Sequence, residues 1–233
     1  MVEQQTKPQR GARLANFTLA IANKNYSSWS LRAWMAMREF DIPFAEEVIP
    51  LDVAQTKTKI ARHSGAGRLP VLHHGEVRVW ESLAILEYLA ELFPGKAMWP
   101  KSRAARAMAR AVANEMHAGF QALRNACPMN LRRPHRPLAA GLSEEVLANV
   151  ARIERLWKDC RAAYGKGGPF LFGKFTIADA MYAPVVTRFE TYVIPVSRAS
   201  RDYMDALIAT QSFRDWKEGA AKEKWIIAAD EVA

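Results

Sequence analysis

The sequence predicts an α/β module followed by an all-helical module, on the basis of two patterns. Residues 17–22 and several later short segments show the alternation of apolar and polar residues that is typical of β-strands. From Lys101 onward, the chain is rich in Ala and Arg and has almost no alternating segment. We therefore expect a flexible polar tail over residues 1–16, an α/β domain over 17–95 and a helical domain over 101–233.

The first predicted unit is a strand, a helix and a second strand. Phe17, Leu19 and Ile21 alternate with smaller or polar residues, which indicates a strand. From Trp29, apolar residues recur at helical spacing until "REFDIP", and residues 44–49 form another short strand. Such a β-α-β unit is expected to have a right-handed crossover.

The second predicted unit is a hairpin followed by a helix. Residues 51–67 are polar and rich in turn residues, so we expect only a short or irregular helix there. "RLPVLHHGEVRVW" has two short apolar runs around a turn, which is typical of a β-hairpin. "ESLAILEYLAELFPG" predicts a helix in which Ser82 is an N-cap candidate and Pro94-Gly95 ends the helix.

The remaining elements are all predicted to be helical. Apolar periodicity and helix-forming composition place the helices at about residues 101–126, 143–164, 176–192, 200–209 and 212–221. Thr176 and Asp179 have the spacing of a capping box, which predicts a structural role at the start of the third of these helices.

Composition excludes several classes of function. The 233 residues carry a net charge of +9, but the basic residues are scattered and no nucleic-acid-binding motif accompanies them. No apolar run approaches the roughly 20 residues of a membrane helix, and no apolar segment follows the basic N-terminus as in a secretory signal. Cys127 and Cys160 have no metal-ligand spacing, which favours reduced thiols in a cytoplasmic protein. No metal, nucleic-acid or membrane partner is expected.

The order of these motifs resembles a known family. The βαβ-ββα module with "LPVL" before its hairpin, "ES" at its last helix and a helical second half is similar to cytosolic glutathione transferases over about residues 17–225. "YSSWSLR" resembles the zeta-like and bacterial serine-type members. The resemblance implies a thioredoxin-like first domain, glutathione as co-substrate, a homodimer and a role in detoxification.

Two adjacent serines are the candidate catalytic residues. A helix N-terminus presents free N–H groups and partial positive charge, which stabilise a thiolate, and a serine hydroxyl can donate a hydrogen bond to sulfur. Ser27 and Ser28 stand where the first predicted helix begins, although capping alone is a common role for serine. Comparison with the family leaves open which of the two contacts the sulfur, and Tyr26 is a backup candidate.

The glutathione-binding residues follow from the resemblance. It implies that Pro70 is cis, which would expose the backbone of Leu69 to pair with the cysteinyl part of glutathione, as an added strand does. Glu81 suits the γ-glutamyl ammonium group, and Ser82 with its helix N-terminus suits the γ-glutamyl carboxylate. Arg68 is expected to contact a glutathione carboxylate.

The second substrate is less well defined. Candidates for its site are Tyr26, Arg124 and Arg132, and the arginines of "ACPMNLRRPHRP" could attract an acidic compound as readily as form a solvated loop. The predicted function is transfer of glutathione to a small electrophile. Peroxide reduction, glutathione-assisted cis-trans isomerisation and glutathione binding without catalysis are the alternatives.

Overall fold

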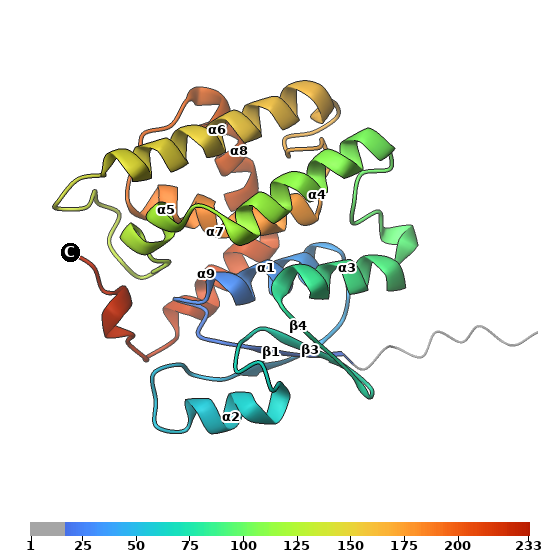
Figure 1. Cartoon of the computed structure of the whole chain (residues 1–233), viewed down its shortest axis with the longest axis vertical. Coiled ribbons are helices and arrows are strands. Elements are labelled where there is room, and N and C mark those ends of the chain that lie inside the picture. The colour runs from blue at the N-terminus through green and yellow to red at the C-terminus, as the bar shows by residue number, and fades with distance from the viewer. Residues whose placement is uncertain (1–16) are drawn as a thin grey trace, which may run out of the picture.

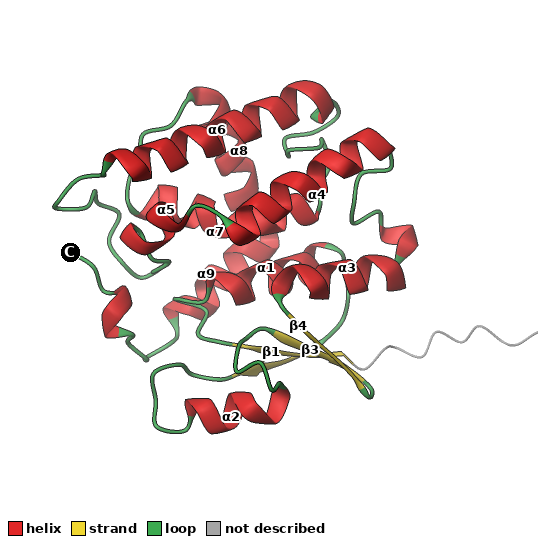
Figure 2. Ribbon diagram, viewed as in Figure 1, coloured by secondary structure: helices red, strands yellow, loops and turns green. Residues whose placement is uncertain are grey.

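A four-stranded mixed sheet forms the base of the molecule (Figure 2). The computed structural model describes residues 17–233, so the tail predicted for residues 1–16 lies outside the described residues. The strand order is β2-β1-β3-β4, with β1 and β2 parallel and the other two pairs antiparallel. The strands are β1 Phe17–Ile21, β2 Ala45–Val48, β3 Val71–His74 and β4 Val77–Trp80.

The two faces of the sheet are covered by different helices. In Figure 1, α1 (Ser28–Glu39) and α3 (Ser82–Leu92) lie above the sheet, and α2 (Thr56–His63) lies below it. Alternation along β1 explains this: Leu19 joins the main core, while Ala20 packs with Ile60 of α2. The short helix expected in residues 51–67 is α2.

The two histidines of β3 confirm this alternation. His73 Nε2 lies 3.0 Å from His63 Nδ1 on α2, whereas His74 Nδ1 lies 2.8 Å from the Tyr88 hydroxyl on α3. Adjacent strand residues therefore reach opposite faces of the sheet, and neither histidine is directed toward the other.

The remaining helices of the described chain stack on α1 and α3 (Figure 1). A 3₁₀ turn, η1 (Pro94–Lys96), follows α3, and a second, η2 (Ala228–Asp230), lies near the C-terminus. The helices between them are α4 Arg103–Ala118, α5 Gln121–Ala126, α6 Glu144–Tyr164, α7 Ile177–Thr191, α8 Arg198–Ile208 and α9 Gln211–Ala221.

The single helix predicted for residues 101–126 is in fact two helices. α4 ends at Gly119, whose backbone is extended, and Phe120 has a left-handed backbone with φ of 60°. A side chain at Gly119 would place its Cβ 2.7 Å from the Glu115 carbonyl oxygen, so glycine is required where the chain turns. The resulting corner places the end of α4 next to the start of α5.

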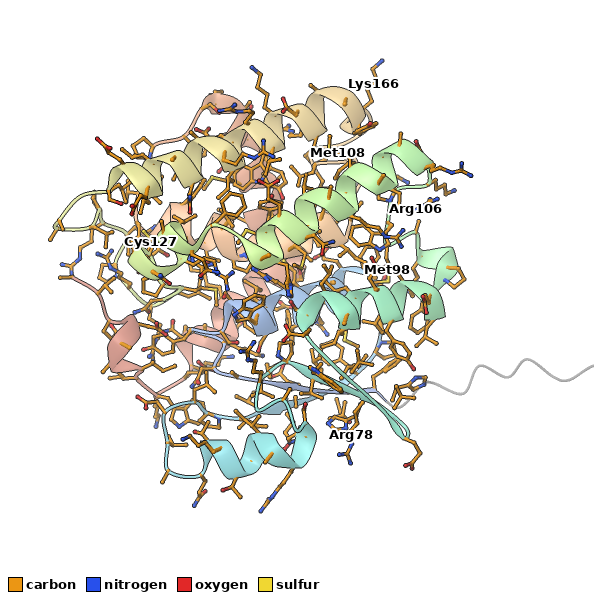
Figure 3. The ribbon with its side chains drawn as sticks, in the orientation of Figure 1. Arg78, Met98, Arg106, Met108, Cys127 and Lys166 are labelled. Carbon is orange, nitrogen blue, oxygen red and sulfur yellow. The ribbon has the colours of Figure 1, made fainter. Side chains whose placement is uncertain are left out.

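A continuous core joins the sheet to the helices. α1 packs against α3, α7 and α9, and α4 also packs against α7, which makes α7 the most buried helix of the molecule. Cys127 and Cys160 lie in this core, and Figure 3 shows Cys127 at the end of α5. Burial raises the pKa of these two thiols to about 11 and about 12. Both thiols therefore stay protonated and unreactive near neutral pH.

The capping box that the sequence predicts is present at the start of α7. Asp179 is fully buried, and its carboxylate accepts hydrogen bonds from the Thr176 backbone N–H (2.8 Å) and hydroxyl (2.9 Å). It also accepts the Leu171 N–H at 3.1 Å, and so ties the preceding loop to the helix. None of the helices in residues 17–233 combines the length and apolarity required to cross a membrane.

Candidate active site

A cleft of about 540 Å³ opens between the carboxyl end of β1, the start of α3 and the corner between α4 and α5. Residues from both modules form its walls, so the site depends on how the sheet and the helical part pack together. The lining residues are Ala22, Ser27, Trp29, Leu51, Ile60, Gly67, Arg68, Leu69, Pro70, Glu81, Ser82, His117, Ala118, Gln121 and Arg124.

Ser27 lines the cleft and is also the N-cap of α1. Its hydroxyl oxygen accepts the Ser30 backbone N–H at 3.3 Å, and its hydroxyl group donates to Ser30 Oγ at 2.8 Å. Ser30 Oγ in turn accepts the Ala22 N–H at 3.0 Å, which fixes the turn between β1 and α1. The Ser27 hydroxyl is thus held at a helix N-terminus, where partial positive charge gathers.

Ser28 occupies a different position from its neighbour. It is the first residue of α1, it is buried, and it is not among the described residues that line the cleft. The sequence leaves open which of the two serines contacts the sulfur and which only caps the helix. In the structure, the cap and the cleft position both fall on Ser27.

The segment before β3 forms one side of the cleft. The Leu69–Pro70 peptide bond is cis, as the resemblance implies, and both residues line the cleft. Arg68 also lines the cleft, with a side chain that is 79% exposed and a guanidinium nitrogen 3.8 Å from Glu81 Oε1. At that distance, in solvent, the pair contributes little to stability.

Glu81 and Ser82 lie side by side at the start of α3. The N-cap position belongs to Glu81, not to Ser82 as expected from the sequence, because Glu81 has the non-helical backbone (φ 67°, ψ 122°) and Ser82 is already helical. Ser82 lines the cleft, and its fully buried hydroxyl has no hydrogen-bond partner within residues 17–233. A buried hydroxyl without a partner costs free energy, which indicates a place for a polar ligand.

Sequence reasoning missed the aromatic wall of the cleft. Trp29 is the second residue of α1, directly after the two serines. Its ring meets the His117 ring edge-to-face, with 5.1 Å between the two ring centroids. The Arg124 guanidinium lies 4.5 Å from the centroid of the same Trp29 ring. His117 and Gln121 come from either side of the α4–α5 corner, and the break that creates this corner has only Gly119 as its sequence signal.

Electrostatics near this wall are dominated by positive charge. Burial, and then the charge of Arg32, lower the pKa of His117, and Glu81 opposes this shift. His117 is therefore neutral at physiological pH, with Nε2 3.7 Å from Glu81 Oε2. Burial also lowers the pKa of Arg124, whose guanidinium donates only long hydrogen bonds, to the His117 and Gly119 carbonyls at 3.3 and 3.5 Å.

Two residues expected near the second substrate are directed elsewhere. The Tyr26 hydroxyl donates to Glu231 Oε1 at 2.5 Å and accepts a hydrogen bond from Arg132 at 3.1 Å, and neither Tyr26 nor Arg132 is among the described residues lining the cleft. Arg132 also donates to the Trp225 carbonyl at 2.6 Å. Both side chains hold the C-terminal segment against the loop before α1. Of the three candidates for this substrate site, Arg124 alone lines the cleft.

Ligating side chains are not clustered in the described part of the chain. No three His, Cys, Asp or Glu residues within 17–233 are grouped so that they could hold a metal ion. The polar side chains that line the cleft carry hydroxyls, a carboxylate, an amide, guanidiniums and a neutral imidazole.

The mixed sheet, its flanking helices and the stacked helical module define a class of two-module proteins with a thioredoxin-like first domain. The family model of the glutathione S-transferase N-terminal domain matches residues 26–92, and that of the C-terminal domain matches residues 109–220. The chain belongs to the cytosolic glutathione S-transferase superfamily. This membership and the fold class are what the sequence predicts.

Relatives with a named activity are distant in sequence. The chain is 27% identical over 179 residues to a probable maleylacetoacetate isomerase of Caenorhabditis elegans, which covers 75% of this chain and 80% of that protein. It is 38% identical over 65 residues to the dichloromethane dehalogenase of Methylorubrum extorquens, but that match covers only 27% of this chain and 23% of the dehalogenase.

Solved structures share the fold. A glutathione transferase homologue from Burkholderia gl BGR1 with bound glutathione has a TM-score of 0.68 at 21% identity, covering 89% of this chain and 100% of that one. A theta class glutathione S-transferase from Xanthomonas axonopodis pv. citri, also with glutathione bound, has a TM-score of 0.63 at 20% identity. The match covers 90% of this chain and 99% of that one.

Proposed function

We infer that the protein is a glutathione transferase that binds glutathione in this cleft and ionises its thiol beside Ser27. The observation that carries the proposal is the Ser82 hydroxyl, which is buried and lacks a partner within residues 17–233, on a residue that lines the cleft next to Glu81. A ligand with an ammonium group and a carboxylate on one carbon suits these two groups, and the γ-glutamyl end of glutathione is such a ligand.

The rest of the tripeptide would extend along the cleft wall. The Leu69 backbone, next to Pro70, offers its N–H and C=O to the cysteinyl unit, and the Arg68 guanidinium supports a carboxylate. This path directs the sulfur toward the start of α1. The helix N-terminus there favours a thiolate, and the thiol proton leaves to solvent. The Ser27 hydroxyl can turn its proton from Ser30 Oγ to the sulfur, because the Ser30 hydroxyl can donate to Ser27 Oγ in return. The thiolate then attacks an electrophilic carbon and forms an S–C bond while the leaving group departs with its electron pair.

The second substrate is a small electrophile, and an acidic one suits the wall best. Trp29 supplies an apolar face, and Arg124 supplies a half-buried positive charge that carbonyl oxygens satisfy only weakly. Similarity to a probable maleylacetoacetate isomerase favours a second candidate reaction. In that reaction the thiolate adds to a conjugated double bond, the C–C bond rotates, and elimination returns the glutathione. Whether glutathione is consumed distinguishes conjugation from isomerisation.

We expect glutathione to raise the melting temperature of the wild-type protein. A ligand that binds only the native state at 100 times its Kd adds about 2.7 kcal/mol of stability, which corresponds to a rise of roughly 5–10 °C at this chain length. Glu81→Ala and Ser82→Ala should each reduce the rise, because each removes a polar contact with the γ-glutamyl group. Glu76→Ala, an exposed substitution in the turn between β3 and β4, is the control. If both cleft variants keep the full rise, these residues do not bind glutathione.

We also propose that the protein is a cytoplasmic homodimer, as the family resemblance implies. Val77 and Trp80 on the edge strand β4 and Leu92 at the end of α3 are exposed apolar side chains that an interface would cover. Sedimentation at micromolar concentration should therefore give twice the chain mass of 26.2 kDa. A single species at the mass of one chain would contradict the dimer.

A further inference from the structure

Arg32, in the middle of α1, is a buried charge that forms no side-chain hydrogen bond with the rest of residues 17–233. Its side chain is 0% exposed, and all three guanidinium nitrogens lack a hydrogen-bond partner within residues 17–233. Buried charges in proteins are normally paired or hydrogen-bonded, because removing an ion from water is costly. An unsatisfied guanidinium in the core therefore calls for an explanation outside the stability of the fold.

Other buried arginines in the same core are satisfied. Arg188 donates to the Cys127 carbonyl at 2.8 Å and to the Pro184 carbonyl at 3.0 Å. Arg133 donates to the Arg136 carbonyl at 2.7 Å. The fold thus supplies carbonyl oxygens where an arginine holds segments together, and within residues 17–233 it supplies none to Arg32.

Arg32 lies close to the cleft, behind one of its lining residues. It lies one helical turn after Ser28, and side chains on a helix lean toward its N-terminus. Its guanidinium carbon lies 4.2 Å from the centroid of the Trp29 ring, and Trp29 is a wall of the cleft. The charge therefore lies directly behind the wall, close to the end of α1 where Ser27 is held.

Among the described groups that face Arg32, the Trp29 ring, Tyr182 and the partly exposed Glu81 offset its charge only in part. Burial lowers its pKa well below the usual value, and repulsion from Arg124 and Arg188 lowers it further, while Tyr182 and Glu81 act in the opposite direction. His117, also nearby, is neutral at physiological pH. A guanidinium keeps its proton in proteins, so Arg32 remains a cation. Glu81 is 39% exposed and is assigned above to the glutathione ammonium group.

We propose that Arg32 is a fixed buried cation whose missing counter-ion is the thiolate of bound glutathione. This role rests on the proposed function, and Arg32 does not touch the sulfur. Its field crosses the Trp29 wall, where low-dielectric surroundings screen it weakly, and adds to that of the α1 N-terminus. The thiol proton leaves to solvent. The thiolate that remains is favoured because it offsets the positive charges of Arg32, Arg124 and Arg188.

The test compares Arg32→Met and Arg32→Lys with a control on the same helix. Arg38→Met removes a half-exposed charge that is paired with Asp215 at 3.0 Å. With saturating glutathione, the ultraviolet absorbance of the thiolate is titrated in each protein, and the glutathione Kd and melting temperature are measured alongside. R32M should raise the pKa of the bound thiol by about one unit, a tenfold loss of thiolate below that pKa, whereas R38M should stay close to wild type. R32K should fall between R32M and wild type, because a lysine buried at this site loses its proton more readily than an arginine.

The melting temperature of the Arg32 variants is the second measurement. Replacing an unpaired buried charge by an apolar side chain of similar length is neutral or stabilising, so R32M should not lower the melting temperature. R32Q replaces R32M if the latter does not fold, and loss of the fold in both would make Arg32 structural and overturn the proposal. An unchanged thiol pKa in R32M, with wild type binding glutathione normally, would overturn this inference alone. Failure of the wild type to bind glutathione would instead remove the proposed function.

Discussion

Ser27→Ala is expected to slow glutathione conjugation at pH 6.5 by roughly ten- to a hundredfold and to have much less effect at pH 9. A charge-assisted hydrogen bond is worth about 1.5–3 kcal/mol, which corresponds to one to two units in the pKa of the bound thiol. Below that pKa the thiolate fraction, and with it the rate, falls by the same factor. At high pH the thiol is ionised without help, so the pH–rate profile shifts and keeps its upper plateau.

Two neighbouring substitutions make this result specific. Ser28→Ala should retain nearly the wild-type rate, because Ser28 is buried outside the lining of the cleft. Ser27→Thr keeps both a hydroxyl and a good N-cap, and should recover part of the rate. The melting temperature should fall in S27A alone, since the lost cap costs about 1 kcal/mol. A larger rate loss in S28A than in S27A would assign the sulfur to the other serine.

Asp179→Ala is expected to be the most destabilising single substitution considered. It leaves the Leu171 and Thr176 N–H groups buried without acceptors, at about 1–3 kcal/mol each, and removes the cap of the most buried helix. A total loss of about 4 kcal/mol would lower the melting temperature by roughly 10–15 °C at this chain length. Asp202→Ala is the control, because its pair with Arg198 is exposed and should contribute almost nothing.

The pH dependence of stability supplies a second check on Asp179. Burial raises the pKa of this carboxyl to about 6, against the hydrogen bonds that lower it, whereas an unfolded Asp titrates near about 3.9. The folded state therefore binds the proton more tightly than the unfolded state. The contribution of this proton to the free energy of unfolding is fully present below about pH 4 and is lost as the pH rises through about 6. The loss amounts to about 3 kcal/mol. The stability gap between wild type and D179A should narrow from pH 4 to pH 7, and a gap that widens would contradict the raised pKa.

Much of the fold could be predicted from local pattern. Alternation at Phe17, Leu19 and Ile21 marks β1 because one face of the sheet is buried by α1 and the other by α2. The Thr176–Asp179 spacing marks the start of α7 because a capping box is a contact within one turn. The break at Gly119 could not be predicted, since strong helix formers on both sides conceal one glycine and a left-handed Phe120.

The general location of the candidate site could be predicted from the sequence, but the roles of its individual residues could not. Ser27 and Ser28 are equivalent in the sequence, and the choice between them depends on which residue starts α1, a boundary that pattern cannot fix to one position. Tyr26 is adjacent to Ser27 but is directed to Glu231, a partner 205 positions along the chain. Trp29 and His117 meet only because the α4–α5 corner packs over α1, and Arg32 looks in the sequence like any helical arginine.

Glutathione binding and thiol ionisation in this cleft are tested most directly by ultraviolet titration of the wild-type protein with saturating glutathione. The expected result is a thiolate band whose midpoint lies at least about one unit below the roughly 8.5 of a free cysteine side chain. The α1 N-terminus, the Ser27 hydroxyl and the Arg32 charge all act in this direction. A midpoint equal to that of glutathione in protein-free buffer, or the absence of binding at millimolar glutathione, would contradict it.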